Sequence, residues 1–171
     1  WKGPVARGGK CLYGKLFRGK AGFVSLDWYP DLANYRRDGY DFDARYDDGM
    51  AAHRDKAVVD TLARHGSLLS RELKAQCGYG RQGLKGFDTI ITRLQMQTYV
   101  SVENFEYNAD SNGNQYGWGI ARYTLPETQH GEAVITSAYS RAPEESFERM
   151  KAHLIKTLPH AEEKAIIQLL K

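Results

Sequence analysis

The chain has 171 residues, close to the size of one domain or of one domain with an appendage, so we do not expect several independent modules. Its hydrophobic content of 42% is enough for a core, and its charged content of 26% is too low for a disordered chain. The net charge of +3 is a mild basic excess, which by itself selects no ligand.

The sequence contains no signal for a membrane or for a bound cofactor. No run approaches the roughly 20 apolar residues of a membrane span, and residues 1–10 lack the order of a signal peptide. Cys11 and Cys77 are too few for a disulfide framework or a four-cysteine zinc site. Phosphate-binding and dinucleotide motifs are absent, and the 5 histidines are dispersed. We therefore expect a cytoplasmic protein with no membrane partner, metal, nucleotide or other cofactor.

Residues 1–43 are expected to form an N-terminal hairpin and a connecting segment. Residues 10–17 and 21–26 are β-type runs joined at Arg18-Gly19-Lys20, where a glycine can take positive φ. A short helix or a structured loop should follow over 27–37. Five aspartates within residues 38–48 lie among Arg36, Arg37 and Arg45. This mixture of charges favours mutual ion pairing and helix capping over a metal site.

Residues 44–126 show helical periodicity followed by alternating strands. Within 44–65 the latter two-thirds should be helical, and Ser67 is a candidate N-cap for a short helix. The remaining expected elements are helices over 68–76 and 87–95 and strands over 98–107 and 116–124. This order of three helices and a hairpin is typical of a winged-helix domain, a helix-turn-helix with a β-hairpin wing.

Residues 127–171 are expected to form a helical tail. Residues 144–158 and 161–170 are amphipathic, and Pro159 separates them. The predicted fold class is therefore α+β: a winged helix with an N-terminal hairpin segment and a C-terminal helical tail.

The third predicted helix is the candidate for insertion into the major groove of double-stranded DNA. With the apolar stripe of 87–95 inward, Thr89, Thr92 and Arg93 point outward, and Arg93 could bind a guanine. The full set of candidate nucleic-acid contacts is Arg71, Lys74, Arg81, Lys85, Thr89, Thr92, Arg93, Trp118 and Arg122.

Gln95 and Gln97 form a Gln-x-Gln pattern where this helix gives way to the wing. On a continuing helix the two amides would point about 200° apart, whereas in extended backbone they project to the same side. Only the extended geometry makes a joint site, in which the amides could position a water or bind a base edge.

Three segments of the chain resemble a group of bacterial proteins called AlkZ-related. They are YRRDGYDFDARYDDG at 35–49, GFDTIITRLQMQTYV at 86–100 and YGWGIARY at 116–123. That group is similar, more distantly, to the AlkZ-type winged-helix DNA glycosylases, which use a Gln-x-Gln motif to excise alkylated bases and open interstrand crosslinks. The resemblance implies that Gln95 and Gln97 are the catalytic pair, with one or both holding the hydrolytic water against the sugar.

Three functional hypotheses remain open at this point. The first is a winged-helix protein that binds double-stranded DNA, either damaged or undamaged, in the handling of alkylation damage. The second is a monofunctional DNA glycosylase with Gln95 and Gln97 as its site. The third is a protein-interaction module whose third helix binds a protein partner. Salt dependence separates DNA from protein binding, because phosphate contacts release counterions.

Overall fold

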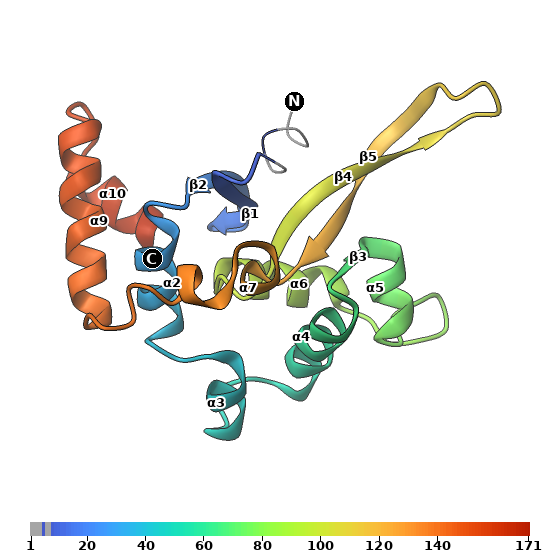
Figure 1. The fold of residues 1–171 in the computed structure, drawn as a ribbon, viewed down its shortest axis with the longest axis horizontal. Helices are drawn as coiled ribbons and strands as arrows, with labels where there is room; N and C mark the ends of the chain where they lie inside the picture. The colour runs from blue at the N-terminus through green and yellow to red at the C-terminus, as the bar shows by residue number, and fades with distance from the viewer. Residues whose placement is uncertain (1–4, 6–7) are drawn as a thin grey trace.

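Two small antiparallel sheets and the surrounding helices make up an α+β fold in the computed structural model, which describes residue 5 and residues 8–171 (Figure 1). The predicted fold class is confirmed at this level. Residues 1–4, 6 and 7 lie outside the described residues, and so does that part of the expectation about a signal peptide in residues 1–10. In chain order the elements are β1 (Cys11–Phe17), β2 (Lys20–Ser25), α2 (Tyr29–Arg37), α3 (Phe42–Asp47), α4 (His53–His65), β3 (Ser67–Leu69), α5 (Ser70–Gln76), α6 (Phe87–Met96), β4 (Ser101–Ala109), β5 (Gln115–Thr124), α7 (Pro126–His130), α8 (Glu132–Ile135), α9 (Pro143–Thr157) and α10 (Glu163–Leu170).

The predicted N-terminal hairpin is confirmed as the antiparallel pair β1–β2. Arg18 and Gly19 at its tip have φ of 53° and 75°, the left-handed geometry that a type I′ turn requires at both central positions. Leu12 and Leu16 pack with α2, whereas Tyr13 packs into the central core with α6. Strand β1 is therefore packed between two groups of helices, whereas β2 and the tip of the hairpin stay exposed or half-buried.

Helix α2 joins the N-terminal and C-terminal segments through buried polar side chains. The side-chain amide of Asn34 donates to the backbone carbonyls of Ala138 and Arg141, each at 3.1 Å. Arg37 is only 2% exposed and forms an ion pair with Glu127 of α7. The expected pairing of Arg37 with the neighbouring aspartates is wrong, because its guanidinium points into the protein.

Two local features differ from the sequence expectations. Asp41 accepts a hydrogen bond from the backbone N–H of Ala44 at 2.7 Å, which confirms the capping expected of this acidic segment, but the helix that it caps, α3, was not predicted from the periodicity. Ser67 is not a helix N-cap, because it belongs to β3, which pairs with β5. Helix α5 begins three residues later, where the N–H of Leu69 donates to the Glu72 carboxylate at 2.8 Å.

The central core lies between α4, α6 and the three-stranded sheet of order β3-β5-β4. The chain order through this region is helix, strand, helix, helix, strand, strand, with β4 and β5 extending well beyond the rest of the molecule (Figure 1). The predicted apolar stripe of α6 is confirmed, since all four of its residues are buried in this core: Phe87, Ile90, Ile91 and Leu94.

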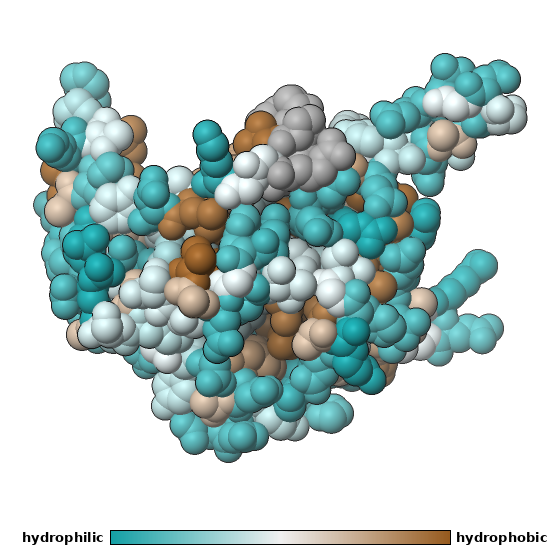
Figure 2. Space-filling view, viewed as in Figure 1, coloured by the Kyte–Doolittle hydropathy of each residue, from teal (hydrophilic) through white to brown (hydrophobic). Residues whose placement is uncertain are grey.

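Helices α9 and α10 confirm the two helices predicted in the tail. Met150, Ile166 and Leu170 pack around Leu32 of α2. A small cavity of about 200 Å³ lies between these helices and the N-terminal hairpin, and Figure 2 shows hydrophobic residues on the surface there. Among the described residues, no helix combines the length and the apolar character needed to cross a bilayer.

His130, the last residue of α7, gives the fold a pH dependence. Burial lowers its pKa below the ordinary value of 6.5, and its Nε2 has no hydrogen-bond partner among the described residues. Because the unfolded chain binds this proton more readily, the stability contribution of neutral His130 is lost as the pH falls below about 6.5. We expect Tm to fall between pH 7 and pH 5 less steeply in His130→Gln than in the wild type. Equal slopes would contradict this.

Candidate functional site

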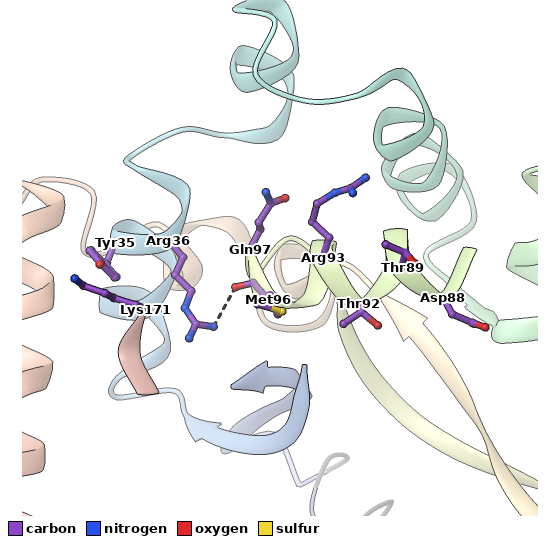
Figure 3. A pocket seen from close by; sticks show the side chains of 9 residues that line it. All are labelled: Tyr35, Arg36, Asp88, Thr89, Thr92, Arg93, Met96, Gln97 and Lys171. Carbon is purple, nitrogen blue, oxygen red and sulfur yellow. Dashed lines mark hydrogen bonds between the residues drawn. The ribbon is translucent and has the colours of Figure 1, made fainter. Parts of the chain in front are cut away.

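The exposed face of α6 forms one side of an open groove of about 850 Å³, which we call the α6 groove (Figure 3). Residues from α2 and from the end of the chain form the opposite side. The groove contains four of the residues predicted from the sequence as functional, Thr89, Thr92, Arg93 and Gln97. Its complete lining is Tyr35, Arg36, Asp88, Thr89, Thr92, Arg93, Met96, Gln97 and Lys171.

The local sequence determines which face of α6 meets this groove. Gly86, just before the helix, has φ of 94°, a conformation that side chains rarely adopt. The helix then buries its apolar stripe, so the positions between those residues point outward at 3.6 residues per turn. The polar side chains Thr89 and Thr92 reach the groove for this reason.

Arg93 faces the groove with its charge already paired. Its Nε lies 3.1 Å from Oδ2 of Asp55, and its second terminal nitrogen lies 2.5 Å from Oδ1. Asp55 is 4% exposed, whereas the Arg93 side chain is 41% exposed. This two-bond arrangement matches the planar guanidinium to the carboxylate and fixes α6 against α4. To bind a guanine, Arg93 would have to leave Asp55.

The DNA-binding hypothesis predicts that releasing Arg93 strengthens the binding. In Asp55→Asn the guanidinium loses its anionic partner, and we expect the salt dependence of binding to steepen by about one phosphate contact. We also expect the free energy of unfolding to fall by about 1–2 kcal/mol, because one partner is partly exposed. Fluorescence anisotropy on a labelled duplex at several salt concentrations measures the first effect. Unchanged or weaker binding by a folded variant would contradict it.

Arg36 holds the α2 side of the groove in place. Its guanidinium donates to the carbonyls of Met96 at 3.0 Å, Leu170 at 3.2 Å and Leu169 at 3.3 Å, and also to that of Leu16. Figure 3 shows the bond to Met96 across the groove. These carbonyls include the ends of α6 and α10, where a cation is favourable. Burial lowers the pKa of Arg36.

The Gln-x-Gln pair does not form a joint site in this structure. Gln95 is 1% exposed: its Oε1 accepts the backbone N–H of Lys15 at 3.0 Å, and its Nε2 donates to the carbonyl of Ile91 at 3.0 Å. Gln97 has φ of −78° and ψ of 1°, close to helical geometry, so its amide does not project beside that of Gln95. Gln97 alone lines the groove.

Most of the predicted phosphate contacts lie outside the groove lining. Lys74 pairs with Asp88 at 3.2 Å, and Arg122 pairs with Glu106 at 2.7 Å, so both charges are partly neutralised. Within the part of the chain that the structure describes, three predicted contacts are exposed and form no ion pair: Arg71, Arg81 and Lys85. They occupy α5 and the link that leads into α6.

Trp118 lies on the extended β4–β5 hairpin and is 94% exposed. Tyr107 and Tyr116 on the same hairpin are also exposed. Residues 101–124 contain three acidic residues and one basic residue, Arg122, which pairs with Glu106, so the β4–β5 hairpin presents aromatic rings without an unpaired positive charge. Such a surface favours stacking over phosphate binding.

Sequence reasoning missed Tyr35, Arg36 and Lys171 as groove residues. Tyr35 and Arg36 belong to a segment expected to be a helix or loop, and Lys171 is more than 70 positions beyond α6. Only tertiary packing brings them to the groove, and no local pattern signals it.

Comparison with known proteins gives one match. A protein-family model described as AlkZ related matches residues 1–171. Searches of curated proteins and of solved structures found no match.

Proposed function

The chain belongs to the AlkZ-related family, and from this membership we propose that it is a winged-helix protein that binds double-stranded DNA in the handling of alkylation damage. The observation that carries the proposal is the α6 groove. A polar helix face, free of the core, lines an open groove in a chain whose family is linked by name to a DNA-repair enzyme.

The topology supports the winged-helix part of the proposal. Helix α4, strand β3, helices α5 and α6 and the pair β4–β5 follow one another in the order that winged-helix domains use. In such domains the third helix approaches the DNA and the hairpin lies beside it. On this assignment α6 is the recognition helix and β4–β5 is the wing.

The wing should act through its tryptophan. Since Trp118 is 94% exposed, Trp118→Ala should leave the free energy of unfolding within about 0.5 kcal/mol of the wild type. Loss of stacking should weaken binding to a duplex with an unpaired base by about 1–3 kcal/mol. Fully paired duplex of the same sequence is the control. An equal loss on both duplexes would contradict base stacking.

A second candidate function is excision of an alkylated base, with Gln97 as the site residue. The observation in its favour is that the Gln97 amide lines the groove and forms no hydrogen bond with the described residues. This amide could hold a water against a sugar bound in the groove. Gln95, buried and already bonded at both ends of its amide, would act by positioning the helix and not by touching the substrate.

The experiment compares two labelled duplexes, one undamaged and one carrying alkylated purines. Retention and abasic-site formation are both scored. Retention without abasic sites supports DNA binding alone, whereas abasic sites that appear only on damaged DNA and disappear in Gln97→Ala support excision. If neither duplex is retained even at low salt, DNA binding is wrong and α6 should be tested against protein partners.

A further inference from the structure

The two hairpins of this protein carry opposite charge. The β1–β2 hairpin, residues 11–26, contains Lys15, Arg18 and Lys20 and no acidic residue. The β4–β5 hairpin, residues 101–124, is net acidic: it contains Glu103, Glu106 and Asp110, and its one basic residue, Arg122, pairs with Glu106. Only the first of the two is suited to the negative charge of a sugar-phosphate backbone.

The β1–β2 hairpin lies directly against α6 at the α6 groove. The backbone N–H of Lys15 donates to the buried Gln95, and its Nζ donates to the Thr92 hydroxyl at 3.3 Å. A Cβ placed on Gly19 at the hairpin tip would be 3.8 Å from the Thr92 methyl. Because Thr92 lines the groove, the hairpin tip lies at the edge of the groove. Figure 3 shows the blue hairpin on the side of α6 away from the teal helix α4.

The three charges of this tip are available to a ligand. Lys15, Arg18 and Lys20 are exposed, and among residue 5 and residues 8–171 none of them forms an ion pair. The two-residue turn and the packing of β1 on both faces hold them in place. Lys171, across the groove, adds a fourth exposed cation.

We propose that the β1–β2 hairpin is the phosphate-binding arm of this protein: Lys15, Arg18 and Lys20 bind the backbone of a DNA duplex that lies along the α6 groove. The inference rests on the proposed DNA binding and adds to it the residues that supply the electrostatic affinity. The wing then contributes stacking, and the hairpin that precedes the helices contributes charge.

The arm variant Lys15→Gln/Arg18→Asn/Lys20→Gln removes the three charges. Asn is chosen at position 18 because it tolerates the left-handed φ of 53° found there. The bond from the Lys15 backbone to Gln95 does not depend on the Lys15 side chain, so we expect an unchanged Tm. A control variant removes three exposed lysines that lie outside the tip and form no ion pair among the described residues: Lys10, Lys156 and Lys164, each changed to Gln.

Binding of both variants to a labelled duplex is measured from 50 mM salt upward. Each lost phosphate contact should reduce the steepness of the plot of log K against log salt by about 0.9. The slope of the arm variant should therefore be shallower than that of the wild type by about 2–3, and its affinity at about 0.1 M salt should be roughly 100-fold weaker. The control variant should keep a slope within about one contact of the wild type.

Three results would overturn the inference, and they differ in what else they imply. If the wild type binds the duplex and the arm variant matches the control, the assignment of the hairpin as the phosphate-binding arm is wrong and the proposed DNA binding stands. If the wild type binds no duplex at 50 mM salt, both this assignment and the proposed DNA binding are wrong. Binding to vesicles of anionic lipid in place of DNA would assign the arm to a membrane surface and overturn it as well.

Discussion

Replacing Arg37 with Met should lower the free energy of unfolding by about 3–5 kcal/mol. The Arg37 guanidinium is buried, pairs with Glu127 and donates to the hydroxyl of Thr98 at 3.1 Å and to its carbonyl at 2.6 Å. Thr98 has φ of 67°, a strained conformation for a β-branched residue, and these bonds hold it at the turn from α6 to β4. Met fills similar space but leaves Glu127 without its partner.

Denaturant unfolding of Arg37→Met measures this effect. Arg71→Met is the matched control, because Arg71 is exposed and forms no ion pair among the described residues; we expect a change within about 0.5 kcal/mol. A loss below about 1 kcal/mol in Arg37→Met would show that the buried network contributes little to the stability of the fold.

Gln95→Leu should cost about 1–3 kcal/mol, although Leu suits a buried helix position. The β1 ladder is irregular between Gly14 and Phe17, and the N–H of Lys15 bonds to the Gln95 side chain there. Leu cannot accept that bond, so the partly buried N–H of Lys15 loses its partner and the hairpin loses one of its attachments to α6. Thermal unfolding measures the loss as a lower Tm.

Gln97→Leu is the control, since it makes the same chemical change two residues away. Gln97 makes no side-chain hydrogen bond with the described residues, so we expect its Tm to stay close to that of the wild type. Equal losses in the two variants would contradict the separate roles of the two glutamines.

The elements of this fold could be predicted where the signal is local. The spacing of Phe87, Ile90, Ile91 and Leu94 gave both α6 and its buried face, and the glycine turn gave the β1–β2 hairpin. Strand β3 was missed because three residues are too few for an alternating pattern. Its pairing with β5 is a tertiary contact that no short window contains.

The site could be predicted only in part. Sequence spacing placed Thr92 and Arg93 on the outer face of α6, and both line the groove. The partners that define their chemistry lie far along the chain: Asp55 is 38 residues from Arg93, and Lys15 is 77 residues from Thr92. Helical periodicity gives the direction of a side chain but not the group that meets it, and so the pairing of Arg93 was not foreseen.

The bonds of Arg36 set the order in which the groove can form during synthesis. Arg36 is made before Leu170, and its bond to the carbonyl of Leu170 spans 134 residues. A ribosome-bound chain that has released the β1–β2 hairpin and α6 still lacks this bond, and contacts of such sequence separation form late. A nascent chain therefore displays the basic hairpin before the groove beside it is complete.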